Sequence, residues 1–326
     1  MKVSIYGAGA IGGWLGVKLA RAGCEVSAVA RGDTLMALRT QGLRLQEGSE
    51  TLAVPVQASD RPADLGVQDL VVVAVKATAM AQVAQSIAPL LGPRTVVLTA
   101  MNGVPWWFFE GFGAGHAGTR LRSVDPDGAI ARAVPAPHII GCVVHASCSL
   151  QAPGIARHHF GNKLIIGEPS GEKTQRVREL TALLERAGFE TVLSDQIQKD
   201  IWYKLWGNMT VNPISAMTGA TTDRILDDDL VRGFISSVML EAREIGSRIG
   251  IPIAQRPEDR HQVTRKLGAF KTSMLQDVEA GRPVELDALV SVVKELGGLT
   301  GVATPFTDAL LGLSRLHARV HGLYEN

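Results

Sequence analysis

The sequence predicts an α/β domain built on a doubly wound sheet, followed by an all-α domain. In the first half of the chain, short apolar runs of strand length alternate with segments of helical period. In the second half the helical period prevails. A length of 326 residues suits two domains. We expect them to span residues 1–194 and 195–326, with the boundary after the apolar run at 191–193.

The first strand begins at residue 2 and turns through three glycines into a helix pattern that closes at Gly23. The glycines match G-x-G-x-x-G, and a preceding strand with a following helix is the context that supports this motif. Its first glycine permits a tight turn, its second admits a pyrophosphate, and its third lets helix and strand pack closely. The predicted dinucleotide-binding loop of this Rossmann-type domain consists of Gly7, Ala8, Gly9, Ala10, Ile11 and Gly12.

The second strand, EVSAVAR, indicates which dinucleotide binds. NAD enzymes usually carry an acidic residue at the end of this strand, about 20 residues after the glycine motif. Here the strand ends on Arg31, and Asp33 comes two residues later. Because a guanidinium can hold a 2′-phosphate through paired hydrogen bonds, NADP(H) is favoured over NAD(H).

Further strands are predicted at 70–76, 95–103, 138–149, 163–168 and 191–193. The run LVVVAVK is apolar until its last residue, as expected for a parallel strand that is buried on both faces. Lys76 ends this strand and Asn102 stands near the end of the next. Ligands of open α/β sheets bind outside the carboxyl ends of the strands, so both side chains are expected to reach the cofactor crevice.

Long amphipathic helices are predicted for the second half. One begins at the acidic run 227–229 and closes at a glycine and a proline near residue 252, and another covers 285–302. A third covers 304–323, with Thr304 as its N-cap and Pro305 at its first position.

A polar stripe stands out in the segment YKLWGNMTVNP. Lys204, Asn208 and Asn212 follow one another at intervals of four and lie on one face of a helix, among core-type apolar residues. Polar groups in such surroundings need partners. Something polar is therefore expected to lie opposite this face of the helix.

The overall composition restricts the classes of partner. The net charge is +1, and the hydrophobic content of 46% is that of a globular chain without a membrane-length run. We expect neither a nucleic-acid nor a membrane partner, and no metal. The cysteines Cys24, Cys142 and Cys148 lack metal-type spacing and look like reduced thiols of a cytoplasmic protein. Composition leaves a homodimer open.

These motifs together resemble the ketopantoate reductases (2-dehydropantoate 2-reductases) over nearly the whole chain. The resemblance is carried by GAGAIG, VVVAVKATAM, TAMNGV, DIWYKLWGNMTVNPISAMTG and SMLQDVEAGRPVELDAL. It implies reduction of the 2-keto group of ketopantoate by NADPH, which gives pantoate for pantothenate biosynthesis.

The resemblance also implies roles for single residues. Lys204 corresponds to the general acid, while Asn208 and Asn212 correspond to residues that line the substrate site. Ser273 corresponds to the serine that binds the substrate carboxylate. Glu285 corresponds to a glutamate that contacts the substrate and is needed for activity. Lys76 and Asn102 correspond to residues that bridge cofactor and substrate.

Two departures from the family pattern bear on the substrate. The stretch 104–137 is longer than expected and contains Trp106 and Trp107, which suit packing, an interface or a wall of the substrate pocket. After Glu285 the chain keeps Asp287 but lacks the asparagine-glycine pair of many members. An inserted lid or a reshaped substrate wall is expected from the longer stretch.

Three other readings stay open. The chain could be a paralogue that reduces a different 2-keto acid. It could be a β-hydroxyacid dehydrogenase, a class that also joins a Rossmann domain to a helical one, although Ser273 together with Glu285 argues against it. It could also be an NADP(H)-sensing protein without catalytic activity, although such a protein need not keep Lys204 and Glu285 together.

Overall fold

The computed structural model describes residues 1–325, which form two compact units. Unit 1 consists of Met1–Met101 and Gly128–Asp200, and unit 2 consists of Asn102–Asp127 with the chain from Ile201 onward. The expected domains 1–194 and 195–326 differ from these units in two ways. The change of unit falls at residues 200 and 201, and the segment 102–127 belongs with the helical unit. An α/β part followed by a helical part is confirmed.

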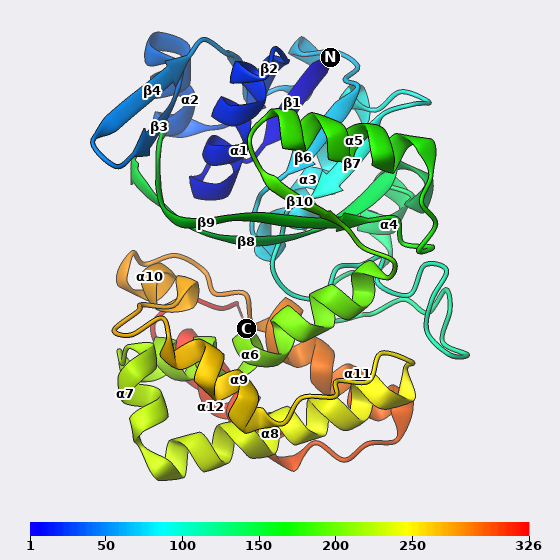
Figure 1. Ribbon diagram of the computed structural model, residues 1–326, viewed down its shortest axis with the longest axis vertical. Coiled ribbons are helices and arrows are strands. Elements are labelled where there is room, and N and C mark those ends of the chain that lie inside the picture. The colour runs from blue at the N-terminus through cyan, green and yellow to red at the C-terminus, as the bar shows by residue number, and fades with distance from the viewer. Residues whose placement is uncertain (326) are drawn as a thin grey trace. The chain divides into compact units, whose positions relative to one another are not determined.

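Unit 1 contains the sheet (Figure 1). Among residues 1–325 its strands form one ten-stranded sheet in the order β4-β3-β9-β8-β7-β6-β1-β2-β5, with β10 paired to β9. The strands are β1 Lys2–Tyr6, β2 Glu25–Val29, β3 Leu43–Glu47, β4 Glu50–Val54, β5 Gln57–Ser59, β6 Leu70–Val73, β7 Val96–Thr99, β8 Ile139–Ala152, β9 Ile155–Gly167 and β10 Glu190–Leu193. Strands β1, β2, β5, β6, β7 and β8 are parallel, whereas the pairs β3–β4 and β8–β9 are antiparallel.

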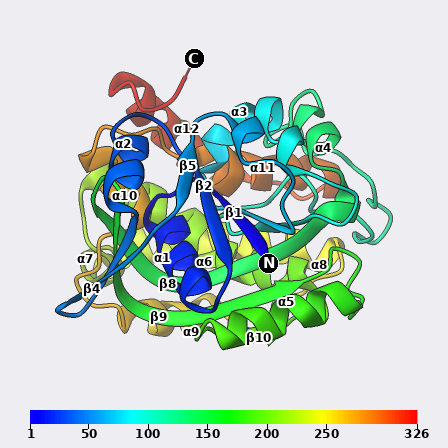
Figure 2. The same ribbon diagram turned by 90° about the horizontal axis from the view of Figure 1, so that it is seen from above.

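The helices of unit 1 cover both faces of the sheet. They are α1 Ala10–Arg21, α2 Gly32–Gln41, α3 Met80–Ser86, α4 Ala129–Ala133 and α5 Gln175–Arg186. Residues of α1 and α5 share one core cluster, in which Trp14 packs edge-on against Phe189. Figure 2 shows α3 on the side of the sheet away from α1 and α5. The sheet is therefore doubly wound, as predicted.

The strands predicted at 70–76 and 95–103 are shorter in the structure. Strand β6 ends at Val73 and β7 ends at Thr99, so the polar residues at the ends of both predicted strands lie on the loops that follow. Strands β3, β4 and β5 were not predicted. They are short and half-exposed, and the hairpin β3–β4 lies at one end of the sheet beside β9. Such strands carry too little apolar alternation to be distinguished from loops.

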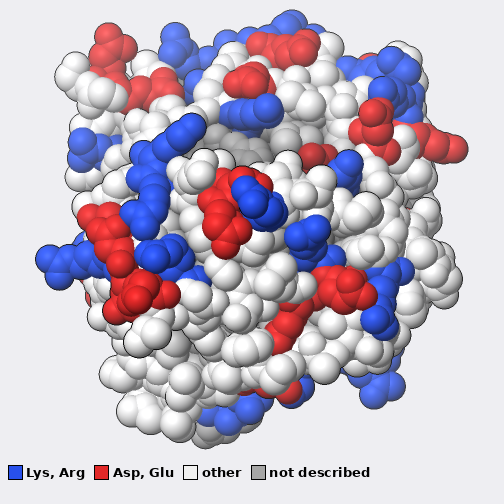
Figure 3. Space-filling model, turned by 60° about the horizontal axis from the view of Figure 1, so that its bottom comes forward, with Lys and Arg blue, Asp and Glu red and all other residues white. Residues whose placement is uncertain are grey.

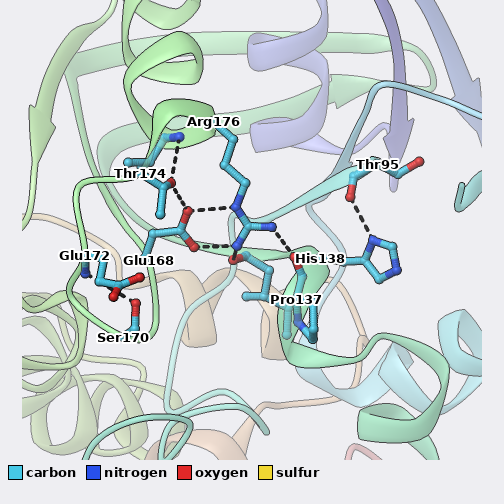
Figure 4. A network of polar contacts seen from close by, with 10 residues as sticks. Thr95, Pro137, His138, Glu168, Ser170, Glu172, Thr174 and Arg176 are labelled. Atoms are coloured by element: carbon cyan, nitrogen blue, oxygen red, sulfur yellow. Dashed lines mark hydrogen bonds and ion pairs between the residues drawn. The ribbon is translucent and has the colours of Figure 1, made fainter. Parts of the chain in front are cut away.

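A buried ion pair fastens the end of β9 to the start of α5 (Figure 4). Arg176 donates from Nε and Nη2 to the two carboxylate oxygens of Glu168, at 2.7 and 2.5 Å, and Thr174 donates to the same carboxylate. Arg176 also donates to the carbonyl oxygens of Pro137 and Ile139, where β8 begins. Paired hydrogen bonds to a buried carboxylate hold this turn in one geometry.

Unit 2 is helical. Its helices are α6 Ile197–Thr218, whose first four residues belong to unit 1, α7 Thr222–Asp227, α8 Asp229–Arg248, α9 Pro257–Arg265, α10 Ser273–Glu279, the π-helix η5 Asp287–Ser291, α11 Val292–Thr300 and α12 Pro305–Val320. The acidic run stands at a helix start, as predicted, because Asp228 caps α8 by accepting from the Val231 N–H at 2.9 Å. Thr304 and Pro305 open α12, also as predicted.

The segment 102–127, which contains most of the longer stretch, packs into the helical core of unit 2. Trp107, Phe108 and Phe109 are almost completely buried, and the Phe108 ring lies 6.2 Å from the ring of Trp202 on α6. The backbone N–H groups of Arg122 and Ser123 donate to the Glu295 carboxylate of α11 at 2.7 and 2.8 Å. Aromatic burial and these two bonds explain why the segment joins unit 2.

Acidic and basic side chains are intermixed over the face of the molecule in Figure 3, in keeping with the net charge of +1. None of the helices within residues 1–325 is both long enough and apolar enough to cross a membrane.

Candidate active site

The glycine loop lies where the sheet reverses its strand order. Strand β1 pairs with β2 on one side and with β6 on the other, and Gly7 follows its carboxyl end. Gly7 has φ +98°, and its N–H donates to the Val29 carbonyl oxygen of β2 at 3.3 Å. A Cβ on Gly7 would lie 2.6 Å from Val75 Cγ1. The positive φ and the tight packing both require glycine at this position.

Gly9 and Gly12 play different parts in the same loop. Gly9 is the N-cap of α1, and a Cβ placed on it would meet no atom within 4 Å. A Cβ on Gly12 would collide with the carbonyl oxygen of Gly7. Gly12 therefore serves helix packing, whereas the space over Gly9 lies at the N-terminus of α1, whose first N–H groups lack intrahelical acceptors. A dinucleotide pyrophosphate suits this arrangement.

Arg31 is exposed at the N-cap of α2, directly after β2 and Ala30. Within residues 1–325 no ion pair or hydrogen bond holds its guanidinium, so its five N–H donors are available to a ligand. Lys76 is the N-cap of a short 3₁₀-helix, Ala77–Ala79, that follows β6. Both residues belong to unit 1, on the loops after parallel strands, where the sequence predicted them.

The polar stripe lies on α6, a helix of 22 residues. Lys204 and Asn208 are half-buried and Asn212 is buried, while Leu205, Trp206 and Met209 turn to the core of unit 2. The Trp206 indole N–H donates to the Met239 carbonyl oxygen of α8 at 2.7 Å. The buried apolar residues of α6 thus fix the rotation of the helix about its axis. This rotation determines in which direction the polar stripe faces.

Lys204 and Asn102 meet in the structure. The Lys204 ammonium donates to Asn102 Oδ1 at 2.8 Å, although 102 residues of sequence separate the two. Asn102 belongs to unit 2, as does Lys204. The expectation that Asn102 also reaches the cofactor stays a prediction. An amide oxygen that accepts from an ammonium fixes the direction of the lysine side chain without neutralising its charge.

A π-helix explains how Asn102 is held. The predicted helix over 285–302 is interrupted, because Asp287–Ser291 is wound as a π-helix before α11 begins. The Ala288 carbonyl oxygen accepts from the Val104 N–H at 2.9 Å, and a Cβ on Gly103 would lie 2.5 Å from the same oxygen. Gly103 thus lets the Asn102 loop approach the π-helix closely, and π-helical turns frequently occur at functional sites.

Glu285 is buried and lies two residues before the first residue of the π-helix, Asp287. Two contacts from the C-terminal residues hold its segment: the Val284 N–H donates to the Leu323 carbonyl oxygen at 3.0 Å, and the Tyr324 hydroxyl donates to Asp287 Oδ1 at 2.7 Å. Burial, together with the hydrogen bond to Asp287, raises the pKa of Tyr324 to about 12. The phenol therefore remains a hydrogen-bond donor at neutral pH.

Ser273 is exposed as the first residue of α10, after the N-cap Thr272, whose hydroxyl accepts from the Leu275 N–H at 3.2 Å. Asn102, Lys204, Asn208, Asn212, Ser273 and Glu285 all belong to unit 2. The structure joins Asn102 to Lys204 directly, and the π-helix links the Asn102 loop to the segment of Glu285. It shows no direct contact of Ser273 with the stripe.

The sequence analysis did not single out Arg260. Its guanidinium lies 5.2 Å from the centre of the Tyr203 ring, one residue before Lys204, and burial lowers its pKa. A Cβ on Gly207 would lie 2.6 Å from Arg260 Nε. Gly207 was the signal in the sequence that could have pointed to this contact. A glycine inside an apolar helix often marks a place where another group packs closely against the helix.

The two units carry different kinds of group. Unit 2 contains Lys204 with Asn102, the amides of Asn208 and Asn212 and the buried Glu285, and unit 1 contains the glycine loop and Arg31. In the part of the chain that the structure describes, no group of three or more His, Cys, Asp or Glu side chains is arranged to hold a metal ion.

Comparisons with known proteins agree with this chemistry. The family described as "Ketopantoate reductase PanE/ApbA" matches residues 3–171, and "Ketopantoate reductase PanE/ApbA C terminal" matches residues 196–318. A protein from Mesorhizobium japonicum named 2-dehydropantoate 2-reductase is 46% identical over 325 residues, which cover 99% of this chain and 100% of the relative.

Two solved structures share the fold along the entire chain. A protein from Ralstonia solanacearum MolK2 that carries a provisional ketopantoate reductase name has a TM-score of 0.96 and 55% identity, covering 99% of both chains. A PanE/ApbA family ketopantoate reductase from Ralstonia eutropha JMP134 has a TM-score of 0.84 and 28% identity, covering 99% of this chain and 100% of the other.

Proposed function

The chain belongs to the ketopantoate reductase family, and on that premise we propose that it reduces the 2-keto group of ketopantoate (2-dehydropantoate) to pantoate with NADPH, in the cytoplasm and in pantothenate biosynthesis. One observation carries the catalytic part of the proposal. Lys204 is a half-buried lysine whose ammonium is directed by Asn102 at 2.8 Å. A positioned cationic donor is what reduction of a ketone requires at the oxygen.

The roles follow from the chemistry of each group. NADPH supplies the hydride when it is bound. Lys204 donates a proton to the keto oxygen from Nζ, and Asn102 orients that ammonium through its amide oxygen. Glu285 corresponds to the family glutamate that contacts the substrate. The electrostatic stabilisation acts on the charge that develops on the oxygen as the hydride arrives.

Substrate binding is assigned to side chains of unit 2. Asn208 and Asn212 each offer an amide that both donates and accepts, which suits the hydroxyl and keto oxygens of a small 2-keto acid. The Ser273 hydroxyl is exposed and available to the substrate carboxylate. These assignments rest on residue type and family correspondence.

The preference for NADPH over NADH is part of the proposal. Its support is Arg31, exposed directly after the second strand, at the position where NAD enzymes usually carry an acidic residue. Gly7, Gly9 and Gly12 with the residues between them hold the pyrophosphate, and Lys76 stands on a neighbouring loop of the same unit.

A substrate panel tests the proposal. NADPH oxidation is followed by absorbance with ketopantoate and with a series of other 2-keto acids, and kcat/KM is expected to be highest for ketopantoate. A higher kcat/KM with another 2-keto acid would identify a paralogue with a different substrate. NADPH binding without turnover of any keto acid would instead favour a sensing role and overturn the catalytic proposal.

A further inference from the structure

Arg260 of α9 carries a positive charge for which the protein supplies no counter-charge. Its guanidinium lies 5.2 Å from the centre of the Tyr203 ring on α6, and its Nε is buried without a hydrogen-bond acceptor. Among residues 1–325, no carboxylate forms an ion pair with it. Arginine is rarely buried unless it is paired, because removing a cation from water costs free energy. The unpaired guanidinium therefore needs an explanation.

The acidic residues of α9 do not compensate this charge. Asp259 accepts from the Arg256 N–H at 2.9 Å at the start of the helix, and Glu258 is exposed. Burial lowers the pKa of Arg260, and Tyr203 is the residue that opposes this effect. A guanidinium nevertheless stays charged in proteins. The charge of Arg260 is therefore available to an anionic ligand.

Gly207 allows the guanidinium to lie directly against α6. A Cβ on this glycine would lie 2.6 Å from Arg260 Nε, 2.8 Å from Nη2 and 3.1 Å from Cζ, so any larger residue would displace the group. Glycine in the interior of a helix is unfavourable, because its backbone has more freedom to lose on folding. Its presence at this position keeps the guanidinium close to the helix backbone.

This position adjoins the polar stripe of α6. Helix α9 lies beside α6 (Figure 1), and its Arg260 contacts Tyr203 and Gly207. Each of these two comes directly before a residue of the stripe, Lys204 or Asn208, and adjacent positions differ by about 100° around a helix. Lys204, Asn208 and Arg260 are all half-buried, so a small molecule can reach them. The unpaired guanidinium therefore lies on the face of α6 that adjoins the proposed proton donor.

We propose that Arg260 binds the carboxylate of the substrate and thereby selects 2-keto acids over neutral ketones. This inference rests on the proposed function, in which a 2-keto acid is reduced at Lys204. In such a molecule the carboxylate is bonded directly to the keto carbon, so a cation beside the proton donor is suitably placed to receive it. A guanidinium can donate two parallel hydrogen bonds to a carboxylate. Ser273 can add a hydrogen bond but no charge.

Arg260→Gln tests the contact by removing the charge and keeping a polar side chain. The KM for ketopantoate should rise about 10–100-fold, as expected for the loss of hydrogen bonds between charged groups, whereas kcat and NADPH affinity should change little. Arg260→Lys keeps the charge and should recover part of the loss. Arg256→Gln is the matched control, because Arg256 is an exposed arginine at the start of the same helix, and it should keep the parent KM. A parent KM in Arg260→Gln would overturn the proposal.

Thermal unfolding and carboxylate binding separate this role from a structural one. The thermal midpoint of unliganded Arg260→Gln should equal or exceed that of the parent, because the variant no longer buries an unpaired charge. Calorimetric titration of the NADP⁺-saturated protein with oxamate, a carboxylate analogue that is not reduced, should give an affinity about 10–100-fold lower in Arg260→Gln. Equal affinities, or a parent that binds no oxamate, would overturn the proposal. If the parent reduces no 2-keto acid, the proposed function fails, and the oxamate titration still decides the role of Arg260.

Gly207→Ala displaces the guanidinium without removing it. The added methyl group would lie 2.6 Å from Arg260 Nε, near the end of a flexible side chain, so the guanidinium should move aside at little cost to folding. The KM for ketopantoate should rise about tenfold or more, while the thermal midpoint stays the same or rises because alanine favours a helix. Gly233→Ala on α8, where a Cβ would meet no atom within 4 Å, is the matched control and should keep the parent KM. A parent KM in Gly207→Ala would refute the placement of the carboxylate beside α6.

Discussion

The Lys204 ammonium lies 2.8 Å from Asn102 Oδ1, and this contact joins α6 to a loop that precedes it by about a hundred residues. The loop is held in turn by the bond from the Val104 N–H to the Ala288 carbonyl oxygen in the π-helix. The direction of the lysine thus depends on three segments that are remote in sequence.

Removal of the lysine should impair chemistry rather than folding. A positioned general acid contributes about 10²–10⁴-fold to rate, so Lys204→Ala should lower kcat by that order while NADPH binding persists. Lys199→Ala is the matched control, because Lys199 is an exposed lysine of the same helix, and it should keep the parent rate. Single-turnover hydride transfer and thermal unfolding measured on the same samples separate the two effects. A poorly folded Lys204→Ala whose folded fraction turns over at the parent rate would refute the catalytic role.

Two alanine substitutions in the glycine loop should have opposite consequences. Gly9→Ala places a methyl group in open space, so the thermal midpoint should be nearly unchanged while NADPH affinity falls because the pyrophosphate loses its room. Gly12→Ala forces a collision with the Gly7 carbonyl oxygen, so it should lower the thermal midpoint directly. Calorimetric titration with NADPH and thermal unfolding measure both. Equal destabilisation by the two variants would contradict this division of roles.

Arg31→Ala should discriminate between the two nicotinamide cofactors. Loss of charge-assisted hydrogen bonds to a 2′-phosphate should weaken NADPH binding by about 1–3 kcal/mol, whereas NADH binding should barely change. Arg21→Ala, at an exposed arginine near the end of α1, serves as the control for a lost surface charge. Dissociation constants for both cofactors decide the matter, and an equal loss for NADPH and NADH would exclude a contact with the 2′-phosphate.

Tyr324→Phe should loosen the segment that carries Glu285. The substitution removes the hydroxyl that donates to Asp287 at 2.7 Å and leaves the Asp287 oxygen with Ser291 alone, at 2.8 Å. The free energy of unfolding should fall by about 1 kcal/mol, the usual contribution of one hydrogen bond. If Tyr324 positions Glu285, kcat should fall further than the loss of folded protein explains. A stability loss with unchanged kcat would limit Tyr324 to a structural role.

His261 should make unit 2 less stable in acid. It is buried on α9, and its Nε2 lies 2.9 Å from Ser236 Oγ of α8. Burial lowers its pKa, with Glu258 opposing the effect and Arg232 and Arg265 adding to it. The unfolded chain binds a proton near pH 6.5, where the folded protein does not. Stability is therefore complete above about pH 6.5 and declines as the pH falls from there toward the lower folded pKa. Urea unfolding at a series of pH values should show a smaller acid loss in His261→Asn than in the parent. An identical pH dependence in both would contradict the burial of a neutral histidine.

Local patterns were enough for several features. The dinucleotide loop could be predicted from the first twelve residues alone, because its strand, its turn and the N-terminus of its helix follow one another directly in the sequence. The stripe of Lys204, Asn208 and Asn212 could be predicted as one helix face, because helical period is a local property. The position of Arg31 after the second strand followed in the same way. The residues assigned from family correspondence, such as Ser273, remain predictions.

Other features depend on contacts between distant segments. The division of the chain is discontinuous, because the aromatic segment 102–127 is buried against helices that appear about a hundred residues later. The π-helix at Asp287–Ser291 frees the Ala288 carbonyl for Val104, and nothing in its own sequence distinguishes it from an α-helical start. Helical period predicts α12 as a helix, but only the fold decides that Leu310 and Leu311 are buried while Leu313 and Leu316 are exposed.

The sequence by itself determined the kinds of elements, the dinucleotide loop and the polar face of α6, since backbone geometry and side-chain period act over a few residues. Only the tertiary structure decided that Asn102 accepts from Lys204, that Tyr324 braces the segment of Glu285, and that one face of α12 stays exposed. These outcomes depend on which apolar surfaces are buried against one another and on which hydrogen-bond groups remain for partners that are remote in sequence. Both are decided by the packing of the whole chain and not by a short segment.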